Sequence, residues 1–478
     1  MNELVKLTAR EAVAALKKGD LTPVELVDAA AERIAEVEPA VNALPTLAVE
    51  RARAHAERLM QAGHPADPPA GYLYGLPVAI KDLKDVAGVR STKGSPIYAN
   101  HIPERSDYLV KNIEAKAGLI LAKSNTPEFG AGANTFNEVF GKTRNPWDSS
   151  KTCGGSSGGS AVSLATGEVW LASGSDLGGS LRIPASFCSI VGMRPSPGRV
   201  PHGPKDMPFA SLSVEGPMAR TVGDLALFLD TQAGQAALDP LSLPAPARPF
   251  IDAVDNPTAP TRVAFTPDLG IAPVDPEVRA ICAAAVRQFE AMGSGIDEAT
   301  IDLHDAEDIF QTMRAVQYAA SYGKLLAEHR DLLKADIVWN IEKGQALSAE
   351  DVNGAELARG ALYNRTTAFF ERYDLLVSPA VLVPAFDIDQ PYVTEAGGVQ
   401  FDNYVSWLVM SFALTLTACP SISVPCGFTS SGLPVGLQIT APRANEAALL
   451  SAAALFEQAI GVKSGIPIDP IVKHEMSV

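Results

Sequence analysis

The stretch Gly154-Gly155-Ser156-Ser157-Gly158-Gly159-Ser160 is followed closely by Asp176-Leu177-Gly178-Gly179-Ser180, and both are short turns rich in glycine and serine. Earlier in the chain, Val78-Ala79-Ile80-Lys81 places a lysine at the end of an apolar run that is typical of a buried strand. A serine hydroxyl is a useful nucleophile only beside a base, and a lysine is a base only where desolvation keeps it neutral. Ser180, Ser156 and Lys81 therefore predict a hydrolytic centre without histidine.

The glycines before Ser180 suit an oxyanion site. Glycine accepts positive φ and lets a substrate approach the backbone, so that several N–H groups can converge on one oxygen, and Gly178 and Gly179 fit this role. Taken alone, the first turn also fits a flexible loop or a phosphate cradle, and Lys81 also fits a salt-bridged core residue. A P-loop is excluded, because its pattern needs Lys and then Ser or Thr after the last glycine, whereas Ala161-Val162 follows Ser160.

Further motifs extend along the chain, and together with the two turns they resemble the amidase signature family over nearly the whole sequence. They are Gly75-Leu76-Pro77-Val78-Ala79-Ile80-Lys81-Asp82, Asn145-Pro146-Trp147-Asp148, residues 174–185, Gly192-Met193-Arg194-Pro195, Gly216-Pro217-Met218-Ala219-Arg220-Thr221-Val222 and Gly432-Leu433-Pro434-Val435-Gly436-Leu437-Gln438. The resemblance implies an α/β fold, namely a single large α/β/α sandwich with a central mixed, twisted sheet that helices cover.

The resemblance also implies roles for single residues. Ser180 would be the acylated nucleophile, Ser156 the middle serine held by a cis peptide bond, and Lys81 the terminal base. The backbone N–H groups of the turn before and at the nucleophile would form the oxyanion hole, and the turn after Pro127-Glu128-Phe129 would line the substrate channel. These two sets are Leu177, Gly178, Gly179 and Ser180 for the oxyanion hole, and Gly130 and Ala131 for the channel.

The sequence departs from the family pattern at three positions. Cys153 stands where the family commonly has Pro, Leu177 where Thr, Ile or Met is frequent, and Leu181 where Ile is usual. None of these changes touches the three polar groups. A reactive thiol is one interpretation of Cys153, but a free cysteine is more often a small buried hydrophobe, and we favour that interpretation.

The implied activity is hydrolysis of amide C–N bonds, and we expect hydrophobic aryl or alkyl amides as small-molecule substrates. Carbamates and linear oligoamides are close alternatives. From other classes there remain a glutaminase subunit of a tRNA-dependent amidotransferase, a binding module with an inactive site and a nucleotide-binding protein. The resemblance is compatible with a homodimer, but the residues do not indicate an oligomeric state.

Composition agrees with a large enzyme. The chain has 478 residues, of which 47% are hydrophobic, so length alone predicts two or three domains. The resemblance instead favours one domain, 1–478, with N-terminal helices at 1–65, the catalytic core at 70–200, a surface connection at 236–260, and further strands and pocket-covering helices at 261–478. The net charge of -16 disfavours nucleic acid and anionic membranes as partners.

The remaining composition favours a cytoplasmic protein without cofactors. Met1-Asn2-Glu3-Leu4 is not the start of a basic and apolar signal, and the apolar run 407–418 is too short to span a bilayer. The five cysteines, at positions 153, 188, 282, 419 and 426, lack CxxC spacing, so we expect reduced thiols and neither disulfides nor zinc. We expect no metal cofactor, because the seven histidines are scattered: His55, His64, His101, His202, His304, His329 and His474.

Local patterns predict the elements that surround these motifs. Thr8-Ala9-Arg10-Glu11 and Thr22-Pro23-Val24-Glu25 are capping boxes that begin helices. Strands are predicted at 78–80, 119–122, 169–172, 262–265, 375–378, 421–425 and 435–440, and helices after Ser106-Asp107 and at 276–292, 306–333 and 446–460. Helices at 306–339 and 404–412 would cover the acyl pocket with five aromatic residues: Tyr318, Tyr322, Trp339, Tyr404 and Trp407. The alternative is that these aromatic side chains only pack in the core.

Overall fold

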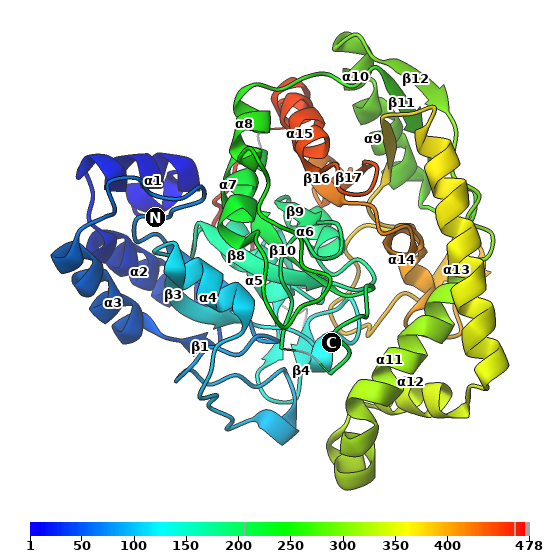
Figure 1. Ribbon diagram of the computed structural model, residues 1–478, viewed down its shortest axis with the longest axis horizontal. Coiled ribbons are helices and arrows are strands. Elements are labelled where there is room, and N and C mark those ends of the chain that lie inside the picture. The colour runs from blue at the N-terminus through cyan, green and yellow to red at the C-terminus, as the bar shows by residue number, and fades with distance from the viewer. Residues whose placement is uncertain (205, 463–464, 474–478) are drawn as a thin grey trace.

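Eleven strands form one mixed sheet through the centre of the molecule (Figure 1), as the computed structural model shows for the residues that it describes, 1–204, 206–462 and 465–473. Their order is β1-β3-β2-β8-β10-β9-β16-β17-β13-β11-β12. The bounds are β1 Thr46–Leu47, β2 Pro77–Lys81, β3 Leu119–Ser124, β8 Leu171–Asp176, β9 Val191–Arg194, β10 Val214–Ala219, β11 Arg262–Phe265, β12 Gly295–Glu298, β13 Leu375–Pro379, β16 Ser421–Phe428 and β17 Pro434–Thr440.

The pairing directions make the sheet mixed. β2 is parallel to both β3 and β8, and β11 is parallel to both β13 and β12. Between these groups, β10, β9, β16 and β17 pair antiparallel with their neighbours, and β1 pairs antiparallel with β3 at one edge. Three two-stranded ribbons lie outside the sheet: β4 Phe136–Asn137 with β5 Gly141–Lys142, β6 Arg144–Asn145 with β7 Asp148–Thr152, and β14 Glu395–Ala396 with β15 Val399–Gln400.

Helices cover this sheet. Figure 1 shows α1–α3 grouped at one side of the molecule and α11–α13 at the other. The bounds are α1 Ala9–Lys18, α2 Pro23–Val41, α3 Val49–Ala62, α4 Tyr108–Ala115, α5 Gly158–Ala165, α6 Arg182–Cys188, α7 Val222–Gln232, α8 Phe250–Asp255, α9 Pro276–Val286, α10 Gln288–Ala291, α11 Ala306–His329, α12 Ala335–Ala346, α13 Ala349–Phe370, α14 Val409–Leu416 and α15 Glu446–Ile460. The mixed sheet with helices around it confirms the α/β fold class.

Short 3-10 helices complete the chain: η1 Glu3–Lys6, η2 Pro96–Tyr98, η3 Glu128–Gly130, η4 Arg330–Leu332 and η5 Ser406–Leu408. Both predicted capping boxes are present, at Thr8 with Glu11 and at Thr22 with Glu25. The apolar run 407–418 forms part of η5 and all of α14, whose residues are buried. Among the described residues, no helix combines the length and the apolar character that crossing a membrane requires.

Several predicted boundaries are wrong. The helix expected at 276–292 is interrupted between α9 and α10, and the one expected at 306–333 ends at His329, where η4 takes over. The strand expected at 169–172 instead runs from Leu171 to Asp176. The segment 236–260 is more than a surface connection, because α8 forms within it and buries Phe250 and Val254 in the core.

The glycine-rich turn before α5 owes its composition to close packing. A Cβ atom on Gly159 would come within 2.3 Å of the Asn125 backbone nitrogen, and one on Gly158 would come within 2.2 Å of the Thr135 hydroxyl oxygen. Only glycine fits at such distances, so α5 can lie entirely buried between the sheet and the loops that follow β3. This packing holds the start of α5 beside the ends of β2 and β8.

Candidate active site

Three neighbouring elements bring the predicted polar groups together. Lys81 is the last residue of β2, Ser156 lies just before α5, and Ser180 lies between β8 and α6. Because β2 and β8 are parallel neighbours, both strands end at the same edge of the sheet, where open α/β sheets bind their ligands. Ser156 and Ser180 line one cavity of about 620 Å³.

Lys81 is wholly buried, and each hydrogen bond that the structure records for its side-chain nitrogen goes to a serine hydroxyl. Its Nζ atom donates hydrogen bonds to Oγ of Ser156 at 2.7 Å, of Ser157 at 2.8 Å and of Ser175 at 3.0 Å. The Ser157 hydroxyl donates in turn to the Ser175 carbonyl oxygen, at 3.3 Å. While Lys81 donates to it, the Ser156 hydroxyl donates no hydrogen bond to any described residue, and Ser156 lines the cavity.

Burial changes the acidity of this lysine. Desolvation lowers the pKa of Lys81 from its ordinary value to about 7. The negative charges of Glu215 and Asp176 oppose this shift, since they favour the ammonium form, and the nearby charge of Lys84 adds to it. Near neutral pH the amine is therefore divided between its charged and its neutral form.

A buried carboxylate organises the turn that carries Ser180. Asp176 accepts hydrogen bonds from the amides of Gly179 at 2.9 Å and Leu181 at 3.2 Å. It also forms ion pairs with Arg182 at 2.9 Å and with Arg194 at 3.3 Å. Burial opposes the ionisation of this carboxyl, but the two guanidinium charges outweigh it and hold the pKa of Asp176 below its usual range.

The backbone amides of this turn differ in their availability. The N–H of Gly179 already donates to Asp176, so an oxyanion could use it only as a shared donor. Within the described residues, no hydrogen bond occupies the amides of Leu177, Gly178 or Ser180. Leu177, Gly178 and Ser180 together line a narrow recess of about 20 Å³.

The two predicted channel residues are placed differently. Gly130 lines the cavity, and a Cβ atom there would lie 3.2 Å from the Ser156 hydroxyl oxygen. Ala131 is fully buried and is not among the residues that line the cavity, while its carbonyl oxygen accepts a hydrogen bond from Lys334 Nζ at 3.5 Å. The structure therefore brings Gly130, but not Ala131, to the reacting groups.

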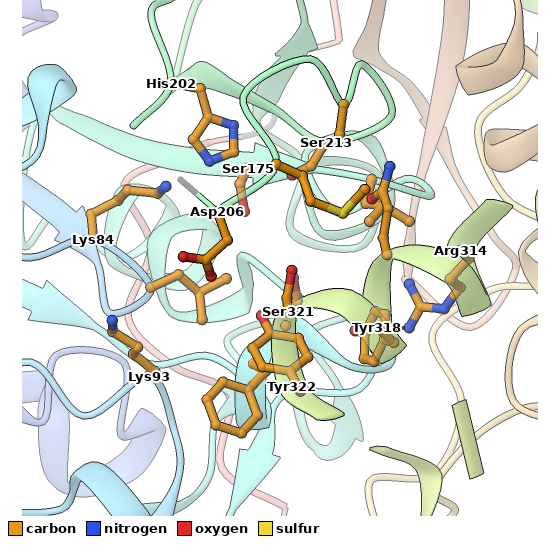
Figure 2. Close-up of a pocket in the computed structure, with 18 of the residues that line it drawn as sticks. Lys84, Lys93, Ser175, His202, Asp206, Ser213, Arg314, Tyr318, Ser321 and Tyr322 are labelled. Atoms are coloured by element: carbon orange, nitrogen blue, oxygen red, sulfur yellow. Dashed lines mark hydrogen bonds between the residues drawn. The ribbon is translucent and has the colours of Figure 1, made fainter. Parts of the chain in front are cut away.

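The cavity has an aromatic wall and a charged opposite side. Figure 2 shows Arg314, Tyr318, Ser321 and Tyr322 projecting from one helix, α11, with Lys84, Lys93 and His202 across from them. Tyr322 stacks on Phe129 with ring centroids 4.6 Å apart. On the opposite side, the charge of Lys84 is paired with Glu215 at 2.8 Å.

Only some of the predicted pocket aromatics reach this cavity. Tyr318 and Tyr322 line it. Tyr404 lies behind them and accepts a hydrogen bond from Arg314, while Trp339 contacts the Tyr404 ring with centroids 6.1 Å apart. Trp407 packs edge-on against Phe386 in the core, as the alternative of ordinary packing predicts.

Sequence reasoning did not single out Ser175 or Ser157 as partners of the lysine. Ser173 and Ser175 are two positions apart in β8 and therefore share one face of the sheet, in the strand next to β2. Accordingly, the Lys81 backbone N–H donates to Ser173 Oγ at 3.1 Å, and the Lys81 side chain donates to Ser175. The alternation of serines in an otherwise apolar strand was the signal that could have found them.

The structure also bears on the predicted state of the cysteines and on metal binding. Cys153 is fully buried, and burial raises the pKa of its thiol to about 12, which disfavours the reactive thiolate. The five cysteines are free and buried. In the described ranges, no group of three or more His, Cys, Asp or Glu side chains is placed to hold a metal ion, and His474 lies outside the described residues.

Comparisons with known proteins identify the family of the chain. The family model for amidases matches residues 25–450. The chain is 34% identical over 473 residues to an acylamidase of Rhodococcus erythropolis, covering 98% of each protein. It is 33% identical over 486 residues to the A subunit of the glutamyl-tRNA(Gln) amidotransferase of Synechococcus sp. (strain RCC307), covering 96% of this chain and 98% of that one.

Among solved structures, the fold is similar to that of a bacterial aryl acylamidase of the amidase signature family. The TM-score is 0.88 at 28% sequence identity, with 95% of this chain and 96% of that chain covered. The family model covers most of the chain, and the two relatives named above align with at least 96% of it. The chain therefore belongs to the amidase signature family and is an amide-hydrolysing enzyme.

Proposed function

We propose that this enzyme cleaves amide C–N bonds through an acyl-enzyme on Ser180, with Ser156 and Lys81 as its proton relay. The observation that supports this most directly is the 2.7 Å contact between Lys81 Nζ and Ser156 Oγ, at a cavity that Ser180 also lines. Burial lowers the pKa of Lys81 to about 7, so a neutral amine is available as a base near neutral pH.

The proposed steps follow from the acidities of these groups. Neutral Lys81 withdraws a proton through Ser156 from Ser180, and Ser180 Oγ attacks the carbonyl carbon. The amides of Leu177, Gly178 and Ser180 stabilise the oxyanion, with Gly179 as a shared donor. The proton returns through Ser156 to the departing nitrogen, because an amine anion is a poor leaving group. Water then hydrolyses the acyl-enzyme with the same relay acting as base.

For the substrate, we propose small hydrophobic aryl or alkyl amides. The aromatic rings of Phe129, Tyr318 and Tyr322 support this, as do the acylamidase and aryl acylamidase relatives. Carbamates and linear oligoamides remain alternatives, since the same acyl-enzyme chemistry would cleave them.

We also propose that residues 1–478 form one domain, because the central sheet takes its strands from Thr46 to Thr440.

A second candidate is the glutaminase subunit of a tRNA-dependent amidotransferase. The similarity to the glutamyl-tRNA(Gln) amidotransferase of Synechococcus favours it. Co-purification with a second protein chain, together with activity on glutamine alone, would select this function. Turnover of anilides by the isolated chain would select the amidase.

The deciding experiment combines a substrate panel with labelling of the nucleophile. Rates of hydrolysis are measured for anilides, primary amides, esters and carbamates, and we expect a fluorophosphonate to modify Ser180 alone, as peptide mass analysis reports. Ser180→Ala should lose nearly all turnover while it keeps the unfolding temperature. If Ser180→Ala retains more than a few per cent of the wild-type rate, or if the reagent modifies a different residue, the proposed nucleophile is wrong.

A further inference from the structure

One side of α11 forms a stripe along the cavity. Phe310, Arg314, Tyr318 and Tyr322 follow one another at intervals of four residues and therefore share a helix face. Phe310 lies against the turn that carries the nucleophile, since a Cβ atom on Gly178 would be 3.0 Å from Phe310 Cζ. Arg314 stands one helical turn farther, or about 5.4 Å along the axis.

Arg314 is a buried cation without an ionic partner. Its side chain is 6% exposed, and no carboxylate among the described residues forms an ion pair with it. The Nη2 atom donates to the hydroxyl oxygens of Tyr318 at 3.0 Å and Tyr404 at 2.6 Å. The guanidinium carbon lies 4.4 Å from the Tyr318 ring centroid and 5.5 Å from that of Tyr404. Neutral groups alone therefore hold this charge in place.

Part of the guanidinium has no acceptor. The buried Nε atom has no hydrogen-bond partner, and none of the described residues accepts a hydrogen bond from Nη1. An arginine does not deprotonate in proteins, so the free energy cost of burying this charge is not relieved by loss of a proton. A buried cation that keeps unused donors beside a cavity is suited to an anionic ligand.

The position of Arg314 relates this charge to the reacting groups. Arg314 lines both the main cavity and the narrow recess, which it shares with Gly178 and Ser180. The acidic side chains of the cavity do not neutralise it. Of the three acidic residues that line it, Glu215 is paired with Lys84, Glu328 is paired with Lys324, and Asp206 lies across from Arg314 in Figure 2. The end of the cavity next to the nucleophile is therefore positively charged.

We propose that Arg314 is a specificity-determining residue that binds a carboxylate of the substrate, carried about one helical turn away from the scissile carbonyl. This inference rests on the proposed amidase function, and it narrows the substrate class from neutral hydrophobic amides to amides that combine an apolar body with one acidic group. The tyrosine rings contact the apolar body, and the guanidinium donates charge-assisted hydrogen bonds to the carboxylate.

The test compares matched anionic and neutral substrates. The first pair carries the charge on the acyl part, as glutaryl and pentanoyl 4-nitroanilide. The second carries it on the amine part, as 4-acetamidobenzoate and 4-acetamidobenzamide. We expect kcat/KM to favour the anionic member of at least one pair by about tenfold or more, and Arg314→Gln to abolish that preference. A neutral preference in both pairs, or a preference that survives Arg314→Gln, overturns the proposal.

Lys324→Gln is the matched control. Lys324 is on the same helix and lines the same cavity, but its side chain is 84% exposed and pairs with Glu328 at 3.8 Å. Its removal deletes the same unit of charge and should leave the anionic preference unchanged. A merely structural Arg314 would behave differently from our expectation, because its loss would lower kcat/KM for both members of a pair equally.

Binding to the wild-type enzyme keeps the test decisive if Arg314→Gln fails to fold. Glutarate should bind at least about tenfold more tightly than 1,5-pentanediol, a neutral compound of the same chain length that the enzyme cannot hydrolyse, in titration calorimetry. Equal binding of the two, together with no anionic preference of the wild-type enzyme in either substrate pair, overturns the proposal. The two failures are distinguishable: turnover of neutral anilides without any charge preference contradicts only the role of Arg314, whereas an unlabelled Ser180 and no amide turnover contradict the proposed function.

Discussion

The side-chain nitrogen of Lys81 lies 2.7 Å from the hydroxyl oxygen of Ser156, and its other two partners are also serine hydroxyls. None of the described carboxylates forms an ion pair with it. The ammonium form therefore gains hydrogen bonds but no close counter-charge, and the cost of burying it prevails. This relationship explains why the pKa of Lys81 falls to about 7, and it leads to a prediction about pH.

The first prediction is that kcat/KM depends on pH through the ionisation of Lys81. Burial lowers the pKa of Lys81 to about 7, so the fraction of neutral amine rises with pH below that value and levels off above it. We expect kcat/KM to be about tenfold lower at pH 6 than on the plateau. A pH–rate profile with a non-ionising anilide measures this directly.

Two variants test whether Lys81 causes this pH dependence of kcat/KM. Lys81→Ala should lose most of the activity and the pH dependence with it. Lys81→Arg should be equally inactive, because arginine stays protonated at every accessible pH and cannot act as the base. An active Lys81→Arg enzyme would show instead that the lysine supplies only positive charge.

The second prediction concerns the carboxylate under the nucleophile turn. Asp176 and both of its arginine partners are fully buried, so Asp176→Asn leaves two guanidinium charges without their counter-ion. We expect the free energy of unfolding to fall by about 3–5 kcal/mol. Asp297→Asn is the control, since the Arg262–Asp297 pair is exposed at 49% and 50% and should contribute far less to stability than the buried cluster. Denaturant unfolding of both variants measures the difference, and similar losses would contradict the assignment.

The third prediction tests how tightly the turn is confined. Gly179 has a φ of +119°, and a Cβ atom there would lie 2.5 Å from the Ser411 Cβ atom. Gly179→Ala must therefore shift the turn away from α14, and we expect kcat to fall by about 10²-fold or more because the oxyanion donors move. Gly354→Ala is the control in α13, where no atom lies within 4 Å of the new Cβ. It should leave kcat unchanged, and an equal loss in both variants would argue against a positional effect.

Short motifs make the polar centre predictable from local sequence. Lys81 ends a buried strand, Ser156 lies within a glycine-rich turn and Ser180 ends another, and such patterns are visible within a few residues. Their convergence depends on β2 and β8 being parallel neighbours, which local sequence does not specify. The family resemblance supplied that part of the prediction.

Residues whose roles depend on distant contacts were missed or misplaced. Arg314 looks like an ordinary helical arginine until α11 packs against the turn at Gly178, far away in sequence. β1 and β12 at the sheet edges and β9 and β10 inside the sheet were not predicted; β1 and β12 have only two and four residues and therefore little pattern of their own. The break between α9 and α10 falls at Arg287, a residue with good helix propensity, so local preference did not indicate it.

The last prediction separates the middle serine from the nucleophile. Ser156 contacts Lys81 directly and is proposed to pass protons without bonding to carbon, so Ser156→Ala should slow amide cleavage more than cleavage of the matched ester, whose leaving group needs a proton less. The ester-to-amide ratio of kcat/KM should therefore rise in Ser156→Ala. Ser180→Ala should abolish both reactions together, because it removes the covalent step itself. Rates for both substrates with both variants decide the matter: an unchanged ratio in Ser156→Ala would mean that Ser156 only positions Lys81 and that the leaving nitrogen receives its proton from another group.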